Sequence, residues 1–469
     1  MGSGINQRRP RFRLFLYFLA FFQLLPTPAA AEITLSEEVE LGRNFNIFLR
    51  SSKTIVKDPE VTDYVEYLLQ RILTQAPPQP FRFSINVIRD DTLNAFAAPG
   101  GYIFLHTGLI LNLRNEAETA GVLAHELAHV TQRHIARRIG QARKIGLLTA
   151  VGALAGVFLA GSGDALPAII SGSMAAGHSA MLGYSRIDEN EADQLGYNYF
   201  MAAGYPPESM VEAFRIIQRP QWITGTEIPV YLSTHPDMSG RIADITARIQ
   251  RASPNEKKTY DNERFLRIQT LIRGRYANPE TALQFFTEQR KGAEAALACL
   301  GFGLLYERTN RIADARQAFE EALRIRPEDP LFLREAGRFN YLKGDRNAAL
   351  MLLQQATAKN PGDYLAMFYY ARLLADAGQK EQAIDCYKQI LRRQPEESET
   401  HYYYAQVLGK SGQLFQAHLH LAYSALYENN APKTEQNYLR LRSMVKNDTD
   451  KEELLLFEKK YAERRSFWQ

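Results

Sequence analysis

The segment His125-Glu126-Leu127-Ala128-His129 carries two imidazoles and a carboxylate at a spacing suited to metal chemistry. On an α-helix, residues four apart lie about 40° from each other around the axis, so both histidines face the same way. Two neutral imidazoles on one face can bind Zn²⁺, and Glu126 beside them can take a proton from an attacking water. A five-residue pattern with two free positions also arises by chance, so it needs support from the rest of the chain.

The residues around this motif predict a helix but leave the third ligand to be found. Residues 116–137 contain no proline and a single glycine, and their apolar side chains recur at steps of three and four. A zinc site needs a third protein ligand and one position open to water. His134 follows His129 by five residues, which is about 140° around a continuous helix, so we predict a surface histidine there and not a ligand.

An acidic run downstream offers the third ligand. Residues 188–193, which read Asp-Glu-Asn-Glu-Ala-Asp, open a second predicted helix that extends to about Gly204. Glu189 and Asp193 share a face of that helix, whereas Glu191 points elsewhere. One carboxylate can bind the metal while its neighbour accepts the free N–H of a ligating histidine. The alternative is a solvated acidic first turn, which the helix dipole favours at any helix N-terminus.

Several elements in this order resemble the M48 family of metallopeptidases. They are Asn94-Ala95-Phe96-Ala97 with Pro99-Gly100-Gly101-Tyr102, the HExxH motif, Glu189-x-x-Ala192-Asp193, and Thr234-His235-Pro236 followed by Arg241-Ile242-Ala243-Asp244. The resemblance covers roughly residues 37–250 and implies one zinc ion per chain. It implies zinc ligands at His125, His129 and Glu189. It also implies that Glu126 is the general base and that Asp193 is a supporting or proton-donating group.

The His-Pro segment adds two further candidates. The resemblance implies that His235 lies near the metal, where a neutral imidazole in the open position would displace water and hold the enzyme inactive. The alternative is a loop histidine without metal contact. Arg241 is a candidate support for the site or for the transition state.

Two segments alternate apolar residues as strands do, at 81–89 and 101–106. An edge strand at Gly100, Gly101 and Tyr102 could bind an extended peptide by strand addition. An ordinary hairpin turn explains the two glycines equally well.

The N-terminus indicates export. Four arginines precede the apolar run Leu14–Leu25, and Ala29-Ala30-Ala31 suits a cleavage site, so residues 1–31 read as a signal peptide cleaved near Ala31. Of 56 basic and 52 acidic residues, those four arginines are removed, and the remaining formally neutral chain gives no case for nucleic-acid binding. We therefore expect a periplasmic protein, with peripheral contact to the outer membrane as an alternative.

Residues 145–182 form an unusual apolar segment. Its first 16 residues, 145–160, carry no charge and would extend about 24 Å as a helix, short of a ~30 Å hydrocarbon core. We prefer a lid or plug over the active site. A membrane-touching hairpin and an ordinary core segment remain the alternatives.

Three residue series repeat with a period of 34 near the C-terminus. They are Gly344, Gly378 and Gly412; Ala315, Ala349, Ala383 and Ala417; and Pro327, Pro361 and Pro395. This is the tetratricopeptide pattern of glycine at the inter-helix turn, alanine at the close helix contact and proline after the second helix. We predict a repeat domain at 262–430 and a C-terminal capping helix at 431–469. Such stacks bind other proteins, so the repeats suggest recruitment.

The sequence thus predicts an α+β, mainly helical protein, with a zincin-like catalytic domain containing a small β-sheet at 32–255, followed by an all-α repeat solenoid. The resemblance and the expected compartment together imply a zinc endopeptidase that degrades unfolded, misassembled or stalled outer-membrane proteins and assists their assembly, with the repeats docking the assembly machinery. A chaperone or scaffold with latent proteolysis and a membrane-embedded protease are the alternatives.

Overall fold

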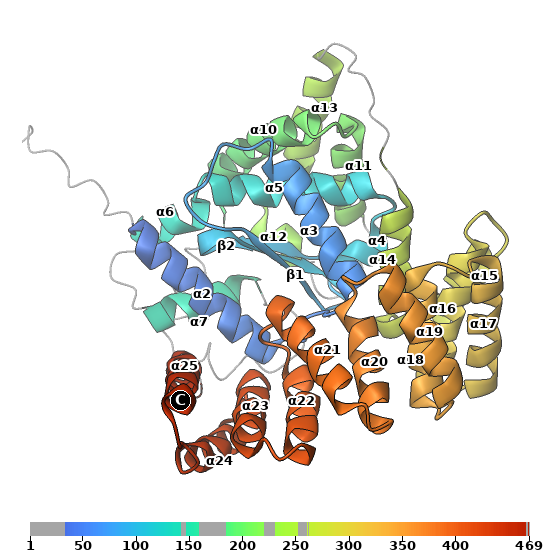
Figure 1. Ribbon diagram of the computed structural model, residues 1–469. Coiled ribbons are helices and arrows are strands. Elements are labelled where there is room, and N and C mark those ends of the chain that lie inside the picture. The colour runs from blue at the N-terminus through green and yellow to red at the C-terminus, as the bar shows by residue number, and fades with distance from the viewer. Residues whose placement is uncertain are drawn as a thin grey trace, which may run out of the picture.

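The computed structural model describes residues 33–141, 147–158, 184–219, 230–251, 260, 262–465 and 468. The predicted signal peptide at 1–31 and residues 145–146 and 159–182 of the apolar segment lie outside the described residues. The described chain is mainly helical around a three-stranded sheet (Figure 1), so the predicted fold class is confirmed. None of its helices combines the length and the apolar character needed to cross a bilayer.

The helices around the sheet begin where local capping chemistry allows. They are α2 (Leu35–Ser52), α3 (Pro59–Leu73), α4 (Thr107–Asn112), α5 (Glu116–Thr131), α6 (His134–Gln141), α7 (Leu147–Phe158), α10 (Arg186–Ala202), α11 (Pro207–Gln218), α12 (Val230–Thr234) and α13 (Met238–Arg251). Asn115 caps α5 by accepting a hydrogen bond from the N–H of Glu118. Ser185 and Asp188 form a capping box at the start of α10. These caps fix where the two predicted ligand helices begin.

The sheet has the strand order β1-β3-β2. β1 (Ser84–Ile88) pairs in parallel with β3 (Tyr102–His106), and β2 (Ala95–Ala98) pairs with β3 in the antiparallel sense. β1 and β3 are the two predicted strands. The short strand β2 is an edge, and only a family motif marked its residues in the sequence.

The prediction of a substrate-binding edge at Gly100, Gly101 and Tyr102 is wrong. Tyr102 begins the central strand and pairs with Ser84 on one side and Ala98 on the other, so its backbone is not free for a peptide. Gly100 and Gly101 have φ angles of 72° and 91° and turn the chain from β2 into β3. They serve the tight turn that was the alternative explanation.

Alternation along the strands separates two apolar cores on the two faces of the sheet, because successive strand residues point in opposite directions. Ala97 and Leu105 join the larger core with α3 and α5, whereas Phe96 and Phe104 join a second core with α2 and α7. Phe96 stacks on Phe158 at the end of α7, with ring centroids 4.8 Å apart. The described part of the apolar segment, residues 147–158, therefore packs against the edge strand.

The helix predicted over residues 116–137 is in fact two helices. Arg133 has a φ of 53°, a left-handed conformation that ends the helical run after α5, and α6 starts at His134. The break turns His134 back toward α5, and its side chain is 0 % exposed. The prediction of a surface histidine is wrong, because its angular argument holds only for an unbroken helix.

The C-terminal half is a stack of antiparallel helix pairs. Its helices are α14 (Asn262–Tyr276), α15 (Pro279–Gln289), α16 (Ala295–Arg308), α17 (Ile312–Ile325), α18 (Pro330–Leu342), α19 (Arg346–Lys359), α20 (Tyr364–Asp376), α21 (Lys380–Arg393), α22 (Ser398–Lys410), α23 (Leu414–Tyr427), α24 (Ala431–Arg442) and α25 (Asp448–Arg465). Gly344, Gly378 and Gly412 lie at turns with φ of 87°, 83° and 79°. Asn310, one period earlier, takes the same conformation at 60°.

The end of the stack differs from the single capping helix that we predicted. Two helices, α24 and α25, close it, separated by residues 443–447. Asn447 accepts a hydrogen bond from the N–H of Asp450 and so caps α25 as a new helix.

The solenoid curves beneath the first half of the chain, and its C-terminal end returns to α2 (Figure 1). Arg43 of α2 lies 3.1 Å from Glu463 of α25. The largest apolar cluster runs from Val56 to Phe339 and so continues past the predicted boundary between the two domains. The repeats are therefore packed onto the first half of the chain and are not a free appendage.

Candidate metal centre

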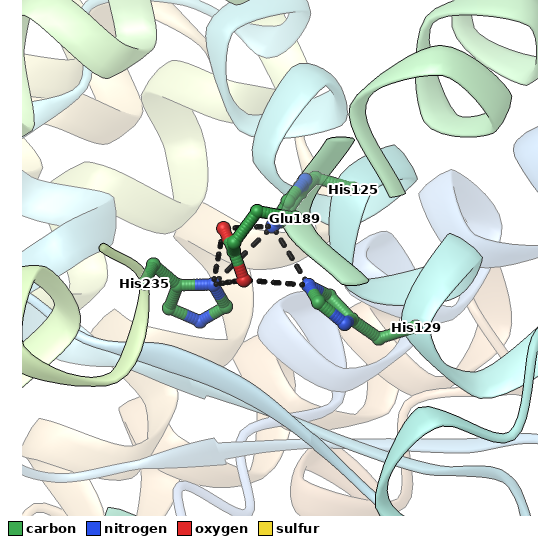
Figure 2. A group of neighbouring side chains, drawn as sticks. All are labelled: His125, His129, Glu189 and His235. Atoms are coloured by element: carbon green, nitrogen blue, oxygen red, sulfur yellow. Dashed lines mark hydrogen bonds and ion pairs between the residues drawn. The ribbon is translucent and has the colours of Figure 1, made fainter. Parts of the chain in front are cut away.

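Helices α5 and α10 and the end of α12 bring four potential metal ligands together (Figure 2). His125, His129, Glu189 and His235 are buried, and one ligand atom from each lies within 4.8 Å of all the others. The Nε2 atoms of His125 and His129 are 2.9 Å apart, and Oε1 of Glu189 is 3.4 Å from Nε2 of His129. The three ligands expected from the sequence thus converge on one point.

Close packing of α5 on α10 depends on a glycine. A Cβ at Gly196 would lie 2.9 Å from the carbonyl oxygen of Ala124, one residue before His125. A larger residue there would push the helix that carries Glu189 away from the helix that carries the two histidines.

The chemistry of the cluster fits a zinc ion. Burial lowers the pKa of His125 to about 4 and holds the pKa of His129 well below its usual range, so both rings are neutral near pH 7. Neutral imidazoles and an ionised carboxylate are the donors that zinc takes in catalytic sites.

Asp193 and Arg241 contact the side chains of the potential metal ligands and fix their positions. Oδ1 of Asp193 lies 3.0 Å from Nδ1 of His125, on the side of the ring away from the other ligands. Arg241 donates from Nε to Oδ2 of Asp193 at 2.7 Å, and its Nη1 lies 2.5 Å from Oε2 of Glu189. The guanidinium thus bridges Asp193 and Glu189, the two carboxylates predicted to share one helix face.

Glu126 has no hydrogen-bond partner for either carboxylate oxygen among the described residues. Its side chain is fully buried, and burial together with the charge of Glu189 raises the pKa of Glu126 well above its usual range. A raised pKa suits a carboxyl that must both take and give a proton.

His235 lies inside the cluster. Its Nδ1 is 3.1 Å from Oε1 of Glu189 and 3.3 Å from Nε2 of His125, and its Nε2 is 3.6 Å from Oε1 of Glu126. Its imidazole therefore stands between the three expected ligands and the expected base.

Sequence reasoning missed three neighbours of the cluster. The ring of Tyr184 stacks on His129 with centroids 3.7 Å apart, and Tyr231 stacks on His235 at 4.2 Å. Tyr231 precedes His235 by four residues, a spacing that could have indicated a shared face, whereas no pattern marks Tyr184. His134, expected at the surface, lies with its Nδ1 2.7 Å from Nδ1 of His129.

A cavity of about 580 Å³ lies between α10 and α13. Glu189, Asp193 and Arg241 line it, so the carboxylate side of the cluster borders open space.

Comparison with protein families identifies both halves of the chain. Residues 56–249 match Peptidase family M48, and residues 273–330 and 341–407 match tetratricopeptide repeats. The chain carries an M48 peptidase domain followed by tetratricopeptide repeats. The M48 match includes all four residues of the cluster, and a match to this metallopeptidase family implies a metal.

Three curated proteins are among those similar to this chain. The putative beta-barrel assembly-enhancing protease of Vibrio cholerae is 29% identical over 66% of this chain and 64% of its own length. The beta-barrel assembly-enhancing protease of Escherichia coli K12 is 28% identical over 70% of this chain and 68% of its own length. The mitochondrial metalloendopeptidase OMA1 of Schizosaccharomyces pombe is 31% identical over 39% of this chain and 52% of its own length. The chain thus spans about two thirds of the length of the bacterial relatives.

Proposed function

We propose that this protein is a zinc-dependent endopeptidase of the periplasm that degrades misassembled or stalled outer-membrane proteins and assists their assembly. The observation that carries the proposal is the convergence of His125, His129 and Glu189 within an M48 domain, with Glu126 beside them. The names of the bacterial relatives and the predicted signal peptide support the compartment and the substrate class.

The residues of the cluster have separate roles in this proposal. His125, His129 and Glu189 would hold zinc, which when bound lowers the pKa of water and polarises the scissile carbonyl. Glu126 takes the proton of the attacking water and passes it to the leaving amine. Asp193 accepts the free N–H of the His125 ring and Arg241 holds Asp193, so the orientation of that ligand is fixed.

We further propose that substrate pairs with β2, the strand edge beside α5. An extended peptide added there would be held through its backbone, with little regard to side-chain identity. Asn94, directly before β2, donates from Nδ2 to the carbonyl oxygen of Phe158 at 2.9 Å. The end of α7 thus lies at this edge, which supports a role for the apolar segment as a lid.

The general-base role can be tested by measuring zinc content and casein hydrolysis together, with and without a chelator. Glu126→Gln should leave the zinc content unchanged and lower the rate about 10²–10⁴-fold, because general-base catalysis contributes that much. Glu208→Gln, an exposed glutamate on α11, is the matched control and should behave as wild type. Wild-type hydrolysis by the Glu126→Gln protein would overturn the assignment.

A second function has its own test because the histidine side of the cluster is buried. His125, Glu126 and His235 are all 0 % exposed, as expected of a scaffold or chaperone whose proteolysis is latent. In that case Glu126→Gln should fully restore outer-membrane protein assembly in cells that lack the protein. Loss of assembly in such cells would favour the peptidase.

A further inference from the structure

We propose that His134 is a positioning residue that orients the ring of His129 for metal binding, and that Glu191 holds His134 in the tautomer this task needs. The inference rests on the proposed zinc site. Neither residue was expected to contact the site from the sequence.

A series of side-chain contacts leads from His129 through His134 to Glu191, away from the metal cluster. Nδ1 of His134 lies 2.7 Å from Nδ1 of His129, on the opposite side of that ring from the other ligands. Nε2 of His134 lies 3.0 Å from Oε2 of Glu191, and Arg137 donates to the same oxygen at 2.9 Å. His134 is 0 % exposed, so no solvent competes for its nitrogens.

Only one arrangement of protons lets His129 bind a metal. Its Nε2 must carry a lone pair, so the ring proton lies on Nδ1 and is donated to His134. Nδ1 of His134 must then be an acceptor, which places the proton of His134 on Nε2, facing Glu191. A carboxylate accepts a hydrogen bond from that N–H and cannot donate one. Glu191 therefore selects the tautomer of His134, and His134 selects the tautomer of His129.

The reverse arrangement would disable the ligand. If His134 donated from Nδ1, the proton of His129 would move to Nε2, the atom that faces the cluster. His125 has a separate support in Asp193, at 3.0 Å from its Nδ1. The two histidines of the HExxH motif are thus oriented by different partners, one by a carboxylate directly and one through a second imidazole.

The backbone is arranged for this contact. Arg133, with φ of 53°, breaks the helix so that His134 starts α6 beside His129. On an unbroken helix the two rings would lie about 140° apart and could not meet.

Zinc affinity, measured by competition with a chromophoric chelator, tests the proposal through two near-isosteric variants. Asparagine carries its amide near the position of Nδ1 in histidine, so His134→Asn can still accept from His129 and should keep most of the affinity. Glutamine carries its amide near Nε2, so His134→Gln loses the contact and should bind zinc about 10–100-fold more weakly. His134→Leu should match His134→Gln.

The role of Glu191 is tested by a double variant. Glu191→Ala should weaken zinc binding less than His134→Leu does, because Glu191 is partly exposed and water can replace it. The His134→Leu/Glu191→Ala protein should bind no more weakly than His134→Leu alone, since Glu191 acts through His134. Glu208→Ala is the control.

Equal zinc affinities for His134→Asn and His134→Gln would overturn the proposal, whether both match wild type or both are weakened by a general packing defect. Circular dichroism of the metal-free proteins verifies that each variant is folded. A wild-type protein that binds no zinc would instead refute the proposed function, so the two failures are distinguishable.

Discussion

At the scale of single residues, His235 gives the cluster one nitrogen more than a catalytic zinc site needs. Such a site keeps one position open, and an imidazole that fills it excludes the attacking water. We therefore expect His235→Ala to raise casein hydrolysis at unchanged zinc content. His418→Ala, a histidine on α23 in the solenoid, is the control. Unchanged or lower hydrolysis in His235→Ala would contradict autoinhibition and leave a transition-state or structural role.

Residue spacing predicted which side chains share a helix face where the helix was regular and failed where it was not. His125 and His129 lie within α5, and Glu189 and Asp193 within α10, so the rule that residues four apart share a face applied to both pairs. His134 follows Arg133, whose backbone has a left-handed conformation. Because this residue is not a glycine, the sequence gives no sign of a turn there. Residues five apart lie about 140° from each other only on one continuous helix, and here α5 ends before His134.

At the scale of elements, α7 and β2 form the contact that must open if the apolar segment is a lid. Phe158 stacks on Phe96 of the edge strand with the two rings 9° from parallel, and also lies 6.2 Å from Tyr184, which covers His129. Removing the ring of Phe158 would loosen the end of α7 and expose the strand edge to substrate. We expect Phe158→Ala to raise casein hydrolysis while zinc content is unchanged.

The control for this experiment is Phe457→Ala, a fully buried phenylalanine of α25 in a separate apolar cluster. Both variants should lose about 3–5 kcal/mol of stability, as Phe→Ala changes in cores do. Only the change at Phe158 should also increase the rate. A similar loss of stability without a gain in rate would make α7 an ordinary part of the core.

Local pattern predicted β1 and β3 but could not give the strand order. Alternation identifies each strand by itself, whereas the order depends on which strands pair. Here β1 pairs in parallel with β3, and β2 lies outside both although it comes between them in the chain. The edge therefore falls at Ala95–Ala98 and not at the glycine turn that follows it.

At the scale of the whole molecule, the repeats bind their own peptidase domain. The period of 34 predicted the helix pairs because each pair is made by contacts between neighbouring residues in the chain. The docking was not predictable in this way, since it depends on pairs such as Asp58 and Arg334, separated by 276 residues. Tyr364 at the start of α20 also donates its hydroxyl to the backbone carbonyl of Lys57. Residues of α18 and α20 in the repeat stack thus contact the peptidase domain.

Arg334 is the central residue of this interface. It is 0 % exposed and lies 2.9 Å from Asp58, which caps α3, 3.0 Å from Asp363 and 2.8 Å from Glu335. Arg334→Ala would leave these carboxylates buried with less compensating charge, which costs about 3–5 kcal/mol when one partner of a buried ion pair is removed. We expect a lower thermal midpoint and faster amide hydrogen exchange in α3 and α20, the helices that Arg334 connects.

The control is Arg324→Ala, which removes a 77 % exposed guanidinium 3.7 Å from Glu321. It should change the free energy of unfolding by about 1 kcal/mol or less. If the two variants unfold alike, apolar packing alone holds the solenoid on the peptidase domain and the buried ion pairs are dispensable.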